Sequence, residues 1–101
     1  MMWYVIHAKD NANSLEKRIE ARQKHLSRLN DLQNNGRLLI AGPLPSIDNE
    51  DPGPNGFDGS LIIAEFASLQ EAQNWAGKDP YLEAGVYESF TVQPFKKVLP
   101  Q

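Results

Sequence analysis

Two short segments of the chain are apolar at consecutive positions, and they constrain the fold more than any other feature. Residues 38–41 are Leu-Leu-Ile-Ala, and residues 61–64 are Leu-Ile-Ile-Ala. Each run is too short for a helix and is bordered by turn-forming residues, which is typical of a strand. A strand with one wet face alternates apolar and polar side chains, so these runs predict strands that are covered on both faces.

The ends of the chain predict two more strands, and a long helix follows the first of them. Residues 3–8 and 86–95 are rich in β-branched and aromatic side chains, as strands are. Asn13 with Glu16 three positions later resembles a capping box, and Gly36 provides a left-handed stop. A helix is therefore expected between Asn13 and Gly36.

A second helix is predicted for residues 68–77. Ser68 is a good N-cap residue, and Pro80 forbids a smooth continuation, so residues 80–84 are expected to form a short turn. Residues 45–59 are polar and rich in proline and glycine, which predicts a long loop. Loops of that length often act as lids over functional sites.

The predicted element order is βαββαβ, the ferredoxin-like arrangement of an α+β domain. A chain of 101 residues fits one domain, so residues 1–101 are expected to fold as a single unit. Two helices can cover only one face of the sheet in this architecture. The other face is expected to meet the same face of a second copy, which predicts a homodimer.

Composition excludes several functional classes. The net charge is −3, from 10 Lys and Arg against 13 Asp and Glu, so no positive field would attract nucleic acid. The absence of cysteine excludes disulfides and Cys nucleophiles and fits a reducing compartment, so a cytoplasmic location is expected. No apolar run approaches the roughly 20 residues that span a bilayer, and the start does not resemble a signal peptide, so no membrane association is expected.

Two polar residues of the first helix are expected to point toward the sheet. At about 100° per residue, the apolar side chains of this helix gather into one stripe that must face the sheet. The stripe consists of Leu15, Ile19, Leu26, Leu29 and Leu32. Arg22 falls near its centre, and His25 lies on its margin three residues later, so the two side chains are neighbours.

Asp79 is the expected partner of these polar groups. The periodicity of the second helix places its carboxylate at the end of the helix layer that faces the sheet. Burying an imidazole or a guanidinium alone costs several kcal/mol, so Asp79 is predicted to meet His25 or Arg22. A histidine bonded to a carboxylate has a fixed tautomer and suits general acid or base chemistry.

Each of these residues also has a structural interpretation. Asp79 followed by Pro80 matches an N-cap with proline at the first helical position. His25 could be a surface or structural histidine, and Arg22 could cover apolar surface with its stem. The convergence of three polar residues on one layer is what favours a functional site.

Other candidates are weaker. His7 in the first strand faces either the pocket or the second copy, depending on register. Gly42 with Pro43 ends a strand where a ligand could approach closely, although a simple strand end explains them too. No metal is expected, because the two histidines lack HxH or HxxxH spacing. Walker, GxGxxG, GxSxG and EF-hand motifs are absent, which disfavours those cofactor and nucleophile classes.

Four segments together resemble the YciI-like (YCII-related) family over nearly the whole chain. They are Trp3-Tyr4-Val5-Ile6, Arg22-Gln23-Lys24-His25-Leu26, Ala41-Gly42-Pro43 and Asp79-Pro80-Tyr81. The resemblance implies a ferredoxin-like subunit that pairs through its sheet into a dimeric α+β barrel, with a cavity between sheet and helices. It also implies that His25 and Asp79 form an active-site pair that uses no nucleotide or flavin cofactor. Some members of the family are linked to eliminating chloride from chlorinated hydroxyquinol-type rings.

Three functions are compatible with these observations, and the one least supported is an interaction protein whose exposed sheet and edges pair with partners other than itself. The other two place a small molecule in the pocket. In the first, the chain is a cofactor-free enzyme of lyase, isomerase or hydrolase type, in which His25 and Asp79 move a proton on a small molecule. In the second, the same pocket binds a small ligand without catalysis and serves as a binding or regulatory module. The expected ligand contacts are Arg22, His7, Gly42, Pro43 and Tyr81.

Overall fold

The computed structural model describes residues 1–101 and has the predicted element order, with one short helix in place of a turn before the last strand. The elements are β1 (Met2–Asp10), α1 (Leu15–Asn34), β2 (Leu38–Pro45), the 3₁₀ turn η1 (Gly53–Asn55), β3 (Phe57–Phe66), α2 (Leu69–Gly77), α3 (Pro80–Glu83) and β4 (Tyr87–Phe95). The prediction of a βαββαβ chain is confirmed.

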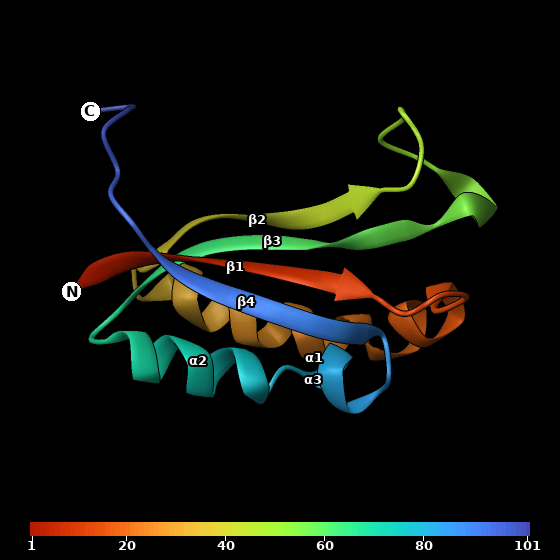
Figure 1. Ribbon diagram of the computed structural model, residues 1–101, viewed down its shortest axis with the longest axis horizontal. Coiled ribbons are helices and arrows are strands. Elements are labelled where there is room, and N and C mark those ends of the chain that lie inside the picture. The colour runs from red at the N-terminus through yellow and green to blue at the C-terminus, as the bar shows by residue number, and fades with distance from the viewer.

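The four strands form one antiparallel sheet in the order β2-β3-β1-β4. All three helices lie on the same face of this sheet, below it in Figure 1. The fold is α+β and ferredoxin-like, as predicted, and the opposite face of the sheet has no helix over it. None of the helices has the length and apolar character needed to cross a lipid bilayer.

The loop between β2 and β3 covers residues 46–56 and is shorter than the predicted 45–59. It projects from one end of the sheet and contains η1 (Figure 1). β3 begins before its apolar run because Gly59 pairs with Lys9 of β1 and with Leu44 of β2. Backbone pairing to two neighbouring strands extends β3 through residues whose side chains alone predicted a loop.

The predicted start of α1 is wrong by one residue. Asn13 has a φ of 57°, in the left-handed region, and Ser14 is the N-cap. The Ser14 hydroxyl makes no capping hydrogen bond, so the expected capping box with Glu16 does not form. The end of the helix is as predicted, because Gly36 has a φ of 70° just beyond it.

The core lies between the helices and the inner face of the sheet. Its larger cluster holds Tyr4, Ile6, Leu29, Leu32, Ile62, Ala64, Phe66, Ala72 and Ala76, all of them buried. A smaller cluster holds Ala8, Ala21, Tyr81, Val86 and Tyr87. This second cluster anchors α3 against α1 and the sheet, and it thereby fixes the segment that precedes α3.

The outer sheet face is apolar but has no cover within the chain. Because the side chains of each strand alternate between faces, the neighbours of the buried core residues point outward. The apolar residues of the outer sheet face are Trp3, Val5, Ile40, Leu61, Ile63 and Phe95, and each of them is at least partly exposed. His7 lies in the middle of this face, between Leu61 of β3 and Thr91 of β4.

Gly59 tests the close approach of β1 and β3. A methyl group at this position would collide with the backbone carbonyl oxygen of Ala8. We expect Gly59→Ala to lower the free energy of unfolding by about 2–3 kcal/mol, since overpacking against backbone forces a strand to shift. Urea denaturation followed by circular dichroism measures this.

The matched control is Gly42→Ala, because an added methyl group at Gly42 has no heavy atom within 4 Å. Its effect on unfolding is expected to stay within about 0.5 kcal/mol. Equal denaturation midpoints for the two variants would contradict the register of β1 and β3.

Candidate active site

The structure brings His25 and Asp79 together, as predicted. Nδ1 of His25 lies 2.9 Å from Oδ1 and 3.0 Å from Oδ2 of Asp79. Their side chains are only 8% and 4% exposed, so the pair is screened from bulk water. His25 projects from the middle of α1, and Asp79 lies just before α3, so the contact joins segments that are 54 residues apart.

Asp79 is both a helix cap and the partner of His25. Its Oδ1 also accepts a hydrogen bond of 2.8 Å from the backbone N–H of Tyr81, and Pro80 occupies the first position of α3. The two interpretations that the sequence left open are therefore both correct. A carboxylate held from two directions is well placed to fix the orientation of an imidazole.

Aromatic rings hold the imidazole of His25 in place. The ring of Tyr81 stacks on it with centroids 3.9 Å apart and planes 12° apart, and Tyr87 meets it edge-on at 6.4 Å. Because a carboxylate only accepts, the neutral imidazole must carry its proton on Nδ1. Nε2 then keeps a lone pair, and it has no hydrogen-bond partner in the protein.

A cavity of about 200 Å³ opens beside His25, between α1 and the strands β2 and β3. Four of the five expected ligand contacts line it, namely Arg22, Gly42, Pro43 and Tyr81. The fifth, His7, does not, because it points to the outer sheet face. The cavity shared by His25 and these residues is called the dyad cavity below.

Arg18, and not Arg22, is the buried arginine of α1. Arg18 is 6% exposed, whereas Arg22 is exposed at the rim of the dyad cavity. Ile19, which the predicted stripe placed toward the sheet, is 64% exposed. The buried face of the helix consists instead of Arg18, Ala21, His25, Leu29 and Leu32.

Asp10 is the reason that α1 turns Arg18 inward. The guanidinium makes a bidentate pair with this carboxylate, Nε to Oδ2 at 2.9 Å and Nη2 to Oδ1 at 3.0 Å. Nη2 also donates to the backbone oxygen of Gly59 at 3.0 Å and to Oγ of Ser60 at 2.9 Å. A buried charge with this many partners is stabilised in one position.

These contacts keep a fixed positive charge at the polar end of the dyad cavity. Burial lowers the pKa of Arg18, but the hydrogen bonds and the charge of Asp10 outweigh burial and raise it above its usual value. The guanidinium carbon also lies 4.8 Å from the ring centroid of Tyr81. Arg18 therefore places a guanidinium cation, paired with Asp10, in the wall of the dyad cavity, which His25 also lines.

Both tyrosines beside His25 are neutral phenols. Burial raises the pKa of Tyr81, although Arg18 and Arg22 oppose the shift. Burial also raises the pKa of Tyr87, whose hydroxyl group is buried without a hydrogen-bond partner. His25 therefore packs between aromatic rings that carry no charge near neutral pH.

Nowhere do three His, Asp or Glu side chains come together in a group that could hold a metal ion.

Comparison with known proteins adds the family to this geometry. The sequence profile of the YCII-related domain matches residues 2–96. The chain belongs to the YCII-related family. Protein YciI of Escherichia coli O6:H1 is 60% identical over 97 residues, which is 96% of this chain and 99% of that protein. An uncharacterized protein of Haemophilus influenzae is 57% identical over 97 residues, with the same coverage.

Among solved structures, the YCII-related chain is similar to a dehydrochlorinase. The protein is 5-chloro-2-hydroxyhydroquinone dehydrochlorinase (TftG) from Burkholderia phenoliruptrix AC1100, in complex with 2,5-dihydroxybenzoquinone. The TM-score is 0.82 at 27% identity, and the match covers 94% of each chain. A protein from Agrobacterium tumefaciens matches with a TM-score of 0.54 at 13% identity, over 98% of this chain and 95% of that one, which shows the shared fold alone.

The pairing with Asp79 predicts the tautomer of His25. In the wild type, neutral His25 is expected to carry its proton on Nδ1, because that nitrogen faces the carboxylate. In Asp79→Asn the tautomer preference should weaken or reverse, since the amide can also donate. Long-range ¹H–¹⁵N correlation spectra of the imidazoles measure this, with His7 as the internal reference.

Asparagine keeps the helix cap while removing the carboxylate, because Asn and Asp are comparable N-cap residues. The unfolding midpoint of Asp79→Asn should therefore change less than that of Asp79→Ala, which also loses the cap at a cost of about 1 kcal/mol. Wild-type His25 found protonated on Nε2 when neutral would contradict the assignment.

Proposed function

We propose that the chain is an enzyme acting on small molecules, in which His25, held by Asp79, takes a proton from the substrate and returns it. One observation carries the proposal: the buried imidazole of His25 borders the dyad cavity, and its Nδ1 is held by the buried carboxylate of Asp79. This arrangement fixes the tautomer that leaves Nε2 free to act as a base.

The chemistry follows from the bond between Asp79 and His25. When Nε2 accepts a proton, the imidazole becomes a cation, and the nearby carboxylate stabilises that charge without moving. The stacked ring of Tyr81 keeps the imidazole plane fixed during the transfer. Holding a base in one orientation removes part of the entropy cost of reaching the transition state.

Arg18 and Arg22 favour substrates with an acidic oxygen. Arg18 is locked by four hydrogen bonds, so its charge is in place before a ligand arrives. Arg22 lies exposed at the rim of the dyad cavity, where its guanidinium group can meet an anionic group of the ligand as it enters. Developing negative charge on an oxygen beside His25 would be stabilised by both arginines.

The similarity to the dehydrochlorinase indicates which substrates to test first. That relative acts on a chlorinated hydroxyhydroquinone, and the likeness extends over 94% of both chains. We propose hydroxylated aromatic or quinone-like rings that carry an anionic leaving group. In such a reaction Nε2 of His25 takes a proton from a ring hydroxyl group and returns it to the ring carbon that bears the leaving group. A second hydroxyl proton is then lost to solvent, its O–H electron pair forms a C=O bond, and the leaving group departs as an anion with the electron pair of its own bond, with no external oxidant.

Chloride release from 5-chloro-2-hydroxyhydroquinone tests the proposal. Replacing the base, as in His25→Asn, is expected to lower kcat by about 10²- to 10⁴-fold. Arg22→Ala is expected to raise KM more than it lowers kcat, because an exposed side chain can be removed without unfolding the protein. Thermal denaturation of each variant checks that the fold is kept.

His7→Asn is the matched control, because His7 lies on the opposite face of the sheet from the dyad cavity. Its activity is expected to equal that of the wild type. Tight binding of 2,5-dihydroxybenzoquinone without turnover of any such ring would instead support a ligand-binding module. Turnover that survives His25→Asn would contradict the proposed base.

We also propose that two copies pair through the outer sheet face. The apolar side chains at the centre of this face belong to Val5, Ile63 and Ile40, which lie at paired positions of adjacent strands. A contiguous apolar surface of this kind is costly to leave in water. Pairing the same face of two copies about a two-fold axis would bury it on both sides at once.

A charge at the centre of this face should block the pairing. We expect Ile63→Lys to convert a dimer into a monomer, because the ammonium group would have to be buried against an apolar partner surface. The control is Ile47→Lys, a change at a 45% exposed isoleucine in the β2–β3 loop. Sedimentation velocity separates the outcomes, and a wild-type monomer at micromolar concentration would contradict the pairing.

A further inference from the structure

A second cavity, of about 460 Å³, adjoins the dyad cavity. It lies between the first half of α1 and the β2–β3 loop. The two cavities share four lining residues, Arg18, Arg22, Pro43 and Tyr81, and therefore lie side by side. The second one is called the outer cavity below.

The residues that line the outer cavity but not the dyad cavity are largely apolar. Leu15 and Ile19 come from the first turns of α1, Pro52 comes from the loop, and Phe57 begins β3. Ile19 is 64% exposed. The isoleucine that the predicted stripe placed toward the sheet thus lines a cavity and is not part of the core.

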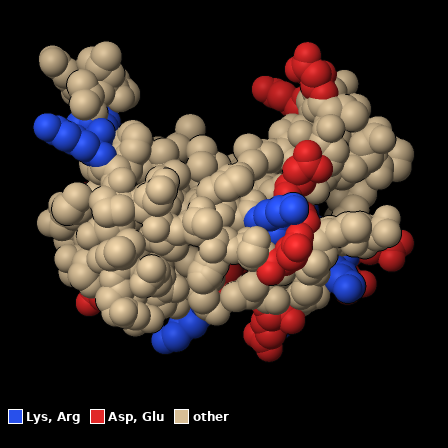
Figure 2. Space-filling model, viewed as in Figure 1, with Lys and Arg blue, Asp and Glu red and all other residues tan.

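Charges distinguish the region where the two cavities meet, which is positive, from the loop side of the outer cavity, which is negative. Arg18 and Arg22 lie where the cavities meet, whereas Asp51 lines the loop side of the outer cavity. Figure 2 shows acidic atoms gathered over the tip of the same loop. A negatively charged group is therefore drawn to the arginines and repelled from the outer end. What fits beside Leu15 and Ile19 is a part of the ligand without negative charge.

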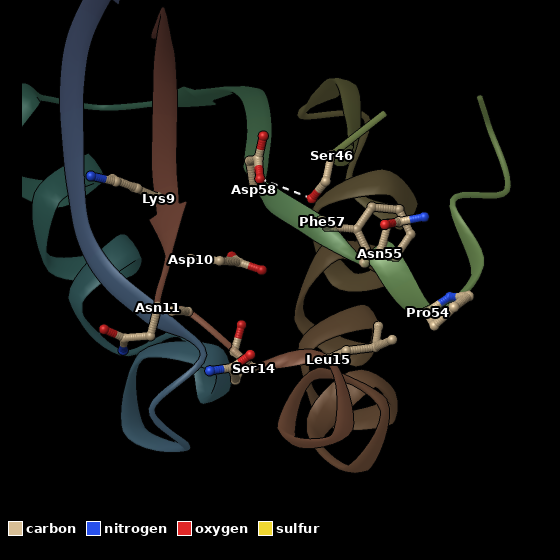
Figure 3. A pocket seen from close by; sticks show the side chains of 13 residues that line it. Lys9, Asp10, Asn11, Ser14, Leu15, Ser46, Pro54, Asn55, Phe57 and Asp58 are labelled. Atoms are coloured by element: carbon tan, nitrogen blue, oxygen red, sulfur yellow. Dashed lines mark hydrogen bonds between the residues drawn. The ribbon is translucent and has the colours of Figure 1, made fainter. Parts of the chain in front are cut away.

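The pocket on the other side of Leu15 and Phe57 differs in character. It measures about 390 Å³ and is mostly polar. Figure 3 shows the carboxylate of Asp10 turned into it, with Ser46 bonded to Asp58 across its upper end at 2.8 Å. An apolar group there would take polar side chains out of water without hydrogen-bonding to them, so the outer cavity is the better site for it.

The dyad cavity is too small to be a complete ligand-binding site. At about 200 Å³ it is smaller than the roughly 300–1,000 Å³ of ordinary small-molecule sites. We infer that the substrate has two parts: an acidic ring beside His25 and an uncharged apolar substituent that occupies the outer cavity against Leu15, Ile19 and Phe57. The inference rests on the proposed function for the place of the ring, and it adds the substituent as the determinant of specificity.

Calorimetry with two probes tests the outer cavity directly. The probes are 2,5-dihydroxybenzoquinone and its 3-hexyl derivative. Burying two or three methylene groups is expected to make the hexyl probe bind about 10- to 100-fold more tightly than the parent in the wild type. In Ile19→Asp this advantage should fall to less than about threefold, while the Kd of the parent stays within about twofold, because the parent does not reach Ile19.

Ile47→Asp is the matched control, because Ile47 is an exposed isoleucine that does not line the cavity. It should keep the full advantage of the hexyl probe. Equal affinity of both probes in the wild type, or equal weakening of both by Ile19→Asp, would overturn the inference. So would the loss of the hexyl advantage in Ile47→Asp.

The calorimetry and the chloride-release assay together separate this inference from the proposed function. Turnover that depends on His25 without any hexyl advantage would overturn the outer site and leave the enzyme intact. A hexyl advantage that Ile19→Asp abolishes, without any turnover that depends on His25, would support the outer site and count against catalysis.

Discussion

The carboxylate of Asp79 holds together the parts of the molecule on which any activity depends. It accepts from the imidazole of His25 and from the backbone N–H of Tyr81, so α1 and α3 meet at one point. The same turn places the ring of Tyr81 flat against the imidazole. Asp79 both caps α3 and orients the imidazole of His25. The folding of α3 and the positioning of His25 therefore depend on the same side chain.

The sequence carried enough information to predict the fold and the pair, but not the second polar network. Periodicity and turn residues are local signals, and they identified the four strands, the two longer helices and the phase of Asp79. The pairing of His25 with Asp79 was predictable because His25 lies on the side of α1 that faces the sheet, and the periodicity of α2, continued past its end, places Asp79 on the same side. Asp79 was also predicted as a cap for a purely local reason, since proline follows it.

Arg18 was missed because a tertiary contact outweighed local hydrophobicity. An apolar stripe through Ile19 gave a helical phase that leaves Arg18 outside. Asp10, at the end of β1, instead pairs with Arg18, and the four hydrogen bonds of this arginine outweigh the burial of one isoleucine. Neither residue carries a sequence motif, and β1 was expected to end before Asp10. Only the three-dimensional meeting of strand and helix reveals the network.

One helix carries two adjacent sets of residues with different tolerance to substitution. Arg18 and His25 are fixed by buried partners, whereas Ile19 and Arg22 are exposed and line the cavities. Exposed positions accept new side chains with small effects on stability. Substitutions on the outer side of α1 can therefore reshape the walls of the two cavities while the buried pair of His25 and Asp79 and the core stay as they are.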